Sequence, residues 1–238
     1  MPDFREPRWG FVEIIIVFIG ILLISLLFSM SDDLMNTLFS IFKMPDTLLS
    51  YFYFGFVVQF TATVSLVLLM TVGIHKAKLS DIGIVNVSIE KYIRYGLLGG
   101  AFLFVIIMLA SFFINYLSPE VEPQVFEQML RMITGNKDFV FLFIIGAVLA
   151  PLSEELFYRG MIYPVFRQKF GPIPAMIMAG IIFGLVHWDL WRTIPLAIGG
   201  MVLCYLYEKT NSIFVTTLAH GVWNGTMSLI VYYSIINI

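Results

Sequence analysis

Long apolar runs separated by short polar segments dominate the chain. About 20 helical residues are needed to cross a hydrocarbon core about 30 Å thick. The longest apolar runs lie at 11–30, 51–74, 95–117, 139 to about 166, 172–187, 193–207 and 213–236. They predict an all-α, polytopic membrane helical bundle with about seven or eight transmembrane helices. The number depends on residues 31–50, whose mixed pattern also fits an interfacial helix.

Composition supports this prediction. Charged residues make up 13% of the 238 residues, about half of the roughly 25% found in a soluble domain. The formal net charge of −2 is too small to indicate nucleic acid as a partner, and the lone cysteine, Cys204, excludes an intrachain disulfide. We therefore expect a single integral membrane domain over residues 1–238, with the lipid bilayer as its surroundings.

The distribution of Lys and Arg predicts the orientation of the chain. If the N-terminus lies inside, the cytoplasmic side receives Arg5, Arg8, Lys76, Lys78, Lys91, Arg94, Arg167, Lys169 and Lys209. The outer side receives only Lys43, Arg131, Lys137 and Arg192, and Arg159 stays within a span. The excess of positive charge predicts a multi-pass protein of the cell membrane whose N-terminus is cytoplasmic.

Polar side chains inside the apolar runs are concentrated in the C-terminal half. They form three clusters, which are EExxxR at Glu154, Glu155 and Arg159, FxxxH at Phe183 and His187, and HxxxN at His220 and Asn224. An ionisable side chain in hydrocarbon costs several kcal/mol, so it usually faces a bundle interior and serves a function. We therefore divide the chain into N-terminal helices at 1–138 and chemically active helices at 139–236.

Helical geometry separates the roles of the two glutamates. Glu155 and Arg159 are spaced i, i+4 and can pair on one face, while Glu154 points about 100° away. Each cluster taken alone also has a plain structural explanation: a solvated salt bridge at a helix end, an interfacial histidine beside Trp188, and a hydrogen bond between helices. Gly180 and Gly184 form a small-xxx-small pair, which predicts close approach of another helix.

Together the three clusters contain the groups that hydrolysis requires. A glutamate can act as general base on water, a histidine can orient that water, and a second histidine with an amide can stabilise an oxyanion. The same groups can instead bind a divalent metal such as zinc, although nothing in the sequence requires one. The zinc-protease pattern HExxH, the serine-hydrolase pattern GxSxG and paired intramembrane aspartates are all absent.

The order of the three motifs on successive helices resembles the CAAX prenyl protease and bacteriocin-processing family, also called the Abi family. The resemblance covers about residues 140–230 and implies an all-helical intramembrane endopeptidase. By this resemblance Glu154 and His187 activate water, and His220 and Asn224 form the oxyanion site. The same comparison makes Glu155, Arg159 and Phe183 supporting residues. Short loops and the single cysteine look more like a bacterial member.

The resemblance implies a membrane-associated protein or peptide as substrate, without naming it or its cleavage site. Two other functions remain open at this point. A non-catalytic membrane scaffold or bacteriocin self-immunity protein would keep the fold without the reaction. A small transporter would use the buried charges for ion coupling, but the sequence shows no internal repeat of the kind expected for one.

Overall fold

All of the described secondary structure is helical. The computed structural model describes residues 6–117, 122–133 and 135–236, and it contains no strand within them. The predicted all-α class is therefore confirmed. Arg5, which entered the charge count above, lies outside the described residues.

Five helical segments of the described chain are long and apolar enough to cross a membrane. They are Phe11–Ser29, Leu48–Ile74, Ile89–Leu117, Asn136–Phe170 and Leu190–Thr210. Two predicted spans are not among them. The run at 172–187 forms a helix of only 14 residues, Pro172–Leu185, and the helix Ile213–Ile236 carries the polar HxxxN cluster. The total of seven or eight spans, like the cytoplasmic N-terminus, stays a prediction.

The chain forms two compact units. Arg8–Ala77 make one, here called the hairpin unit, and residues from Lys78 onward form the body of the other, here called the site unit. All seven predicted site residues belong to the site unit. The boundary at Ala77 and Lys78 reflects packing, whereas the predicted division at residue 138 concerns chemistry and stays a prediction.

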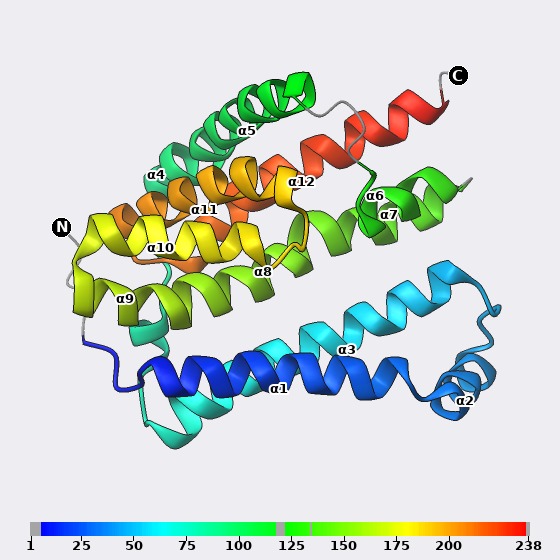
Figure 1. The fold of residues 1–238 in the computed structure, drawn as a ribbon, viewed down its shortest axis with the longest axis horizontal. Coiled ribbons are helices and arrows are strands. Elements are labelled where there is room, and N and C mark those ends of the chain that lie inside the picture. Colours follow the sequence, from blue (N-terminus) through cyan, green and yellow to red (C-terminus); the bar gives the residue numbers. More distant parts are fainter. Residues whose placement is uncertain (1–5, 118–121, 134, 237–238) are drawn as a thin grey trace. The chain divides into compact units, whose positions relative to one another are not determined.

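The hairpin unit consists of three helices. They are α1 (Phe11–Ser29), α2 (Asp32–Phe42) and α3 (Leu48–Leu68), which continues into the π-helical turn η1 (Leu69–Ile74). α1 packs against α3, and the two run side by side (Figure 1). Part of the mixed segment 31–50 is thus helical, as α2, and the Phe39 ring packs edge-on against Tyr51 with centroids 4.9 Å apart.

The site unit is built around α12 (Ile213–Ile236), which packs against most of the other long helices. The preceding elements are the 3₁₀ turn η2 (Leu79–Ile82), α4 (Ile89–Lys91), the π-helical turn η3 (Tyr92–Leu97), α5 (Leu98–Leu117), α6 (Val125–Met132), α7 (Asn136–Ile144), the π-helical turn η4 (Ile145–Leu149), α8 (Ala150–Glu155), the π-helical turn η5 (Leu156–Ile162), α9 (Tyr163–Phe170), α10 (Pro172–Leu185) and α11 (Leu190–Thr210). α9, α10 and α11 lie side by side (Figure 1).

Two prolines interrupt the long helical segment that carries the EExxxR motif. A proline has no backbone N–H, so the carbonyl four residues earlier loses its helical partner. Pro151 follows the π-helical turn η4, which contains the residue four positions earlier, Ala147. Pro164 follows the π-helical turn η5, which contains Gly160 in the same relation. Such turns are frequent at functional sites. Here they flank α8, which carries both glutamates.

Glycines allow neighbouring helices to approach the site closely. A Cβ atom on Gly221 of α12 would lie 2.2 Å from the backbone oxygen of Ala147, the carbonyl that Pro151 leaves without a helical partner. On α10, a Cβ on Gly180 would lie 2.7 Å from a backbone oxygen of α11, and one on Gly184 would lie 2.4 Å from another. The close approach predicted from the small-xxx-small pair is therefore confirmed.

Gly221→Ala should lower the free energy of unfolding by about 1–3 kcal/mol, because the added methyl group overlaps a backbone oxygen that no side-chain rotation can move. Gly55→Ala on α3 is the matched control, since its Cβ would meet no atom within 4 Å. It should be neutral, or stabilising by up to about 1 kcal/mol, because alanine is the better helix former. Thermal unfolding in detergent checks both variants, and equal shifts would rule out the close contact at Gly221.

Candidate active site

A fully buried ion pair lies at the base of the site. Arg159 Nη1 donates to Glu155 Oε1 at 2.8 Å, one helical turn away, and neither side chain is more than 1% exposed. The second terminal nitrogen, Nη2, donates to the backbone oxygen of Gly200 on α11 at 3.0 Å. The pair predicted from the i, i+4 spacing is therefore present, and it also connects the EExxxR segment to α11.

His220 on α12 lies between the two glutamates of α8. Its Nδ1 is 3.0 Å from Glu155 Oε1, and its Nε2 is 3.8 Å from Glu154 Oε2. The imidazole is only 2% exposed. Because a ring has polar atoms at two separate edges, both carboxylates reach the same histidine even though they leave the helix in different directions.

The two glutamates differ sharply in exposure. The Glu155 side chain is fully buried, whereas that of Glu154 is 33% exposed. The prediction that Glu154 is free of the ion pair is consistent with these contacts, since Arg159 pairs with Glu155. Glu154 is thus the carboxylate that water can reach.

Phe183 joins the second motif to the other two. Its ring meets the imidazole of His187 at 5.2 Å between centroids and that of His220 at 5.7 Å, both edge-on. The guanidinium of Arg159 lies over the same ring at 4.9 Å. This buried phenylalanine therefore brings residues of all three motifs into one cluster.

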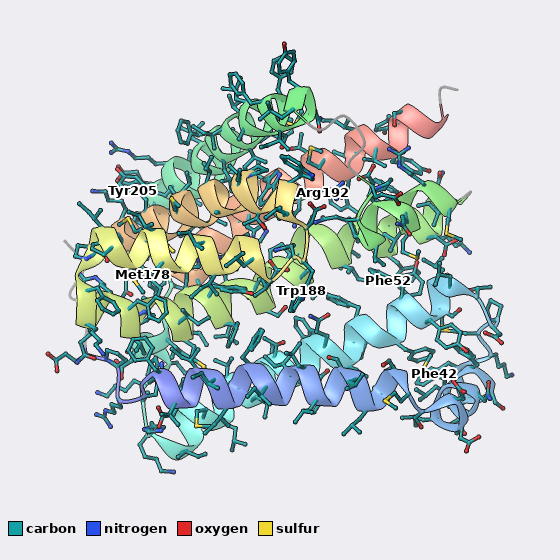
Figure 2. The ribbon with its side chains drawn as sticks, viewed as in Figure 1. Phe42, Phe52, Met178, Trp188, Arg192 and Tyr205 are labelled. Atoms are coloured by element: carbon teal, nitrogen blue, oxygen red, sulfur yellow. The ribbon has the colours of Figure 1, made fainter. Side chains whose placement is uncertain are left out.

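His187 lies just beyond the end of its helix. α10 ends at Leu185, so the histidine begins the short loop to α11 instead of ending a span as predicted. Its Nδ1 is 2.8 Å from the backbone oxygen of Phe183. The next residue, Trp188, has a positive φ of 54° and turns the chain out of the helix. Figure 2 labels Trp188 in this loop and Arg192 in the first turn of α11.

Asn224 uses its amide to bind a backbone oxygen of the neighbouring helical segment. Its Nδ2 donates to the Gly146 oxygen, within the π-helical turn η4, at 3.0 Å. This contact agrees with the plain structural explanation of a hydrogen bond between helices. An amide nitrogen carries two hydrogens, so one donor remains beyond this bond.

Sequence reasoning missed three groups that complete the cluster. They are the backbone oxygens of Gly200 and Gly146 and the indole of Trp223, which stacks on His220 with centroids 5.3 Å apart and planes at 15°. The sequence could have indicated the indole, because Trp223 is three residues after His220 and therefore lies on the same face of the helix. No pattern in the sequence identifies the two backbone acceptors, because they come from other helices.

The side chains of the cluster that could bind a metal ion are carboxylates and imidazoles. Within residues 6–117, 122–133 and 135–236, no three His, Cys, Asp or Glu side chains come together in a group that could hold a metal ion.

Comparison with known proteins identifies the segment that carries the cluster. Residues 136–226 match the sequence model of Rce1-like proteins, described as type II CAAX prenyl endopeptidase Rce1-like. The chain is also 29% identical over 83 residues to a protein of Bacillus subtilis (strain 168) named "Putative membrane peptidase YdiL". That match covers 35% of this chain and about a third, 34%, of the relative's length. No solved structure matches the chain.

The family match begins at the first residue of α7 and ends two residues after Asn224. It includes the EExxxR, FxxxH and HxxxN motifs in full, and together with the five apolar helices it supports a multi-pass membrane protein. The resemblance to the CAAX protease family that these motifs predict is therefore confirmed for residues 136–226, which match its Rce1-like type II endopeptidases.

Proposed function

We propose that the protein is an intramembrane endopeptidase that hydrolyses a peptide bond near the membrane. The observation that carries the proposal is that the ring of Phe183 contacts the imidazoles of both His187 and His220, and that His220 also lies 3.8 Å from Glu154. Its placement within the segment that matches a family of endopeptidases supports the same conclusion. The substrate class is a membrane-associated protein or peptide.

Glu154 and His187 activate the water in this proposal. Glu154 is the partly exposed carboxylate and takes a proton from water as general base. The Phe183 carbonyl can only accept a hydrogen bond, which assigns a proton to Nδ1 of His187. In the neutral imidazole Nε2 then has a lone pair, so it can accept a hydrogen bond from the same water and orient it.

His220 and Asn224 stabilise the oxyanion. Glu155, ionised against Arg159, only accepts hydrogen bonds, so Nδ1 of His220 carries the proton between them. Nε2 can donate to an oxyanion only if it is protonated as well, which makes the working form of His220 an imidazolium. The second N–H of Asn224 supplies a further donor.

The reaction balances with these groups alone. Glu154 removes a proton from water, and the hydroxide attacks the carbonyl carbon of the scissile bond. The negative charge that develops on the carbonyl oxygen is stabilised by the donors of His220 and Asn224. When the tetrahedral intermediate collapses, the C–N bond breaks, and the proton held by Glu154 passes to the leaving amine.

The test compares new peptide termini in membranes of cells that express wild-type protein or Glu154→Ala at matched levels. Termini present only with the wild type are expected, because the variant lacks the general base. Glu127→Ala is the matched control, since Glu127 belongs to an exposed ion pair on α6 and its loss should leave the termini unchanged. Identical termini for wild type and Glu154→Ala, both folded and abundant, would favour the non-catalytic scaffold or self-immunity function instead.

A further inference from the structure

The indole of Trp223, which has no role in the reaction proposed so far, stacks on the histidine of the proposed oxyanion site. The indole of Trp223 and the imidazole of His220 are 5.3 Å apart at their centroids, with 15° between their planes. Both residues are on α12, three positions apart, so they share one face of the helix. Trp223 is only 8% exposed. The stack is therefore part of the protein interior.

The hydrogen bond to Glu155 does not by itself fix the imidazole. The ring turns about the side-chain dihedrals χ1 and χ2, and a single hydrogen bond at Nδ1 does not fix both of them, so the direction of Nε2 can still vary. A flat aromatic surface removes this freedom, because the imidazole must lie parallel to it. The ring of Phe183, which meets the imidazole edge-on at 73°, restricts it further. With these constraints Nε2 points toward Glu154, 3.8 Å away.

We propose that Trp223 is a positioning residue for His220: its indole holds the imidazole with Nδ1 at Glu155 and Nε2 toward Glu154. The consequence for catalysis rests on the proposed function. The orientation of the ring does not, and it can be measured in protein that has no known substrate.

The orientation test is NMR of protein labelled with ¹⁵N-histidine in lipid nanodiscs. The chain has only three histidines, and His75→Gln and His187→Gln variants assign their signals. In the wild type, His220 should give one set of ring signals with Nδ1 protonated. Trp223→Leu should give mixed ring states, whereas Trp223→Phe, which keeps a flat face, should restore the single state.

A second stacked pair on the same helix supplies the control. Tyr232 of α12 stacks on Phe139 with centroids 3.8 Å apart and the same 15° between planes, and it has the same 8% exposure as Trp223. Tyr232→Leu should leave the His220 signals unchanged. An unchanged His220 spectrum in folded Trp223→Leu would overturn the proposal, as would an equal change in Tyr232→Leu. If the leucine variant does not accumulate, Trp223→Met replaces it with another non-aromatic side chain.

Kinetics separate this proposal from the proposed function. With a substrate identified from the new termini, Trp223→Leu should lower kcat by about 10-fold to 100-fold with little change in KM, because a misplaced catalytic group affects the transition state more than substrate binding. Trp223→Phe should recover most of the loss. If the wild type cleaves nothing, the proposed function fails, and the NMR result still decides the role of Trp223. Wild-type kcat in Trp223→Leu would overturn the catalytic part.

Discussion

Replacing Arg159 with methionine should lower the free energy of unfolding by about 3–5 kcal/mol, the usual effect of removing one partner from a buried ion pair. The side chains of Arg159 and Glu155 are 1% and 0% exposed, so the substitution leaves a carboxylate in the interior without its cation. It also removes the hydrogen bond to the Gly200 oxygen, which connects η5 to α11. Thermal or denaturant unfolding in detergent measures the loss.

The matched control has the same spacing in an exposed position. Arg131 pairs with Glu127 at i, i+4 on α6, but these two side chains are 51% and 30% exposed. Arg131→Met should therefore cost no more than about 1 kcal/mol, the range measured for surface ion pairs. Similar losses for Arg131→Met and Arg159→Met would mean that the buried pair contributes nothing beyond an ordinary helical pair.

A double variant tests whether the loss of stability in Arg159→Met comes from the unpaired charge that it leaves behind. Glu155→Gln combined with Arg159→Met removes both charges of the pair, so the carboxylate is not left without its arginine. The amide oxygen of the new side chain can still accept the hydrogen bond from His220 Nδ1. We expect the double variant to be more stable than Arg159→Met alone, since the main penalty of the single change is an uncompensated charge.

Much of the helical structure could be predicted from the sequence. The apolar run at 213–236 coincides with α12, and the run at 11–30 ends one residue beyond α1. The end of α10 could not be placed, since neither proline nor glycine occurs at 186–189, the residues that follow it. There the chain leaves the helix through Trp188, whose positive φ is unusual for a large side chain. His187 was consequently predicted within a span although it lies in a loop.

Some contacts of the candidate site could be predicted from the sequence and others could not, and the difference is whether the contact lies within one helix or between two. Contacts within one continuous helical segment follow from its periodicity, as Glu155 with Arg159 shows. Contacts between helices depend on packing that the motifs do not encode. The Gly146 oxygen that Asn224 binds lies in a π-helical turn beside Pro151, and its availability became visible only in the structure.

The two ring nitrogens of His187 have different roles, and this difference leads to the prediction with the largest effect on activity. Nδ1 is committed to the Phe183 oxygen, and only Nε2 is left to contact water. Asparagine places its amide nitrogen near the position of Nδ1 and has no atom at Nε2. His187→Asn should therefore keep the structural hydrogen bond and lose the catalytic atom. We expect kcat for a substrate identified from the new termini to fall by about 10²-fold to 10⁴-fold, the usual contribution of an acid–base group.

Stability distinguishes this loss from simple damage to the loop. His187→Asn should unfold within about 0.5 kcal/mol of the wild type, because the bond to Phe183 survives, whereas His187→Gln gives up that bond and should be both inactive and less stable. Trp188→Phe alters the neighbouring residue, which is 86% exposed, and should keep its activity. If His187→Asn cleaves within about tenfold of the wild type, Nε2 takes no part in the reaction. Glu154 would then have to activate water without the help of His187, and the only histidine required for cleavage would be His220.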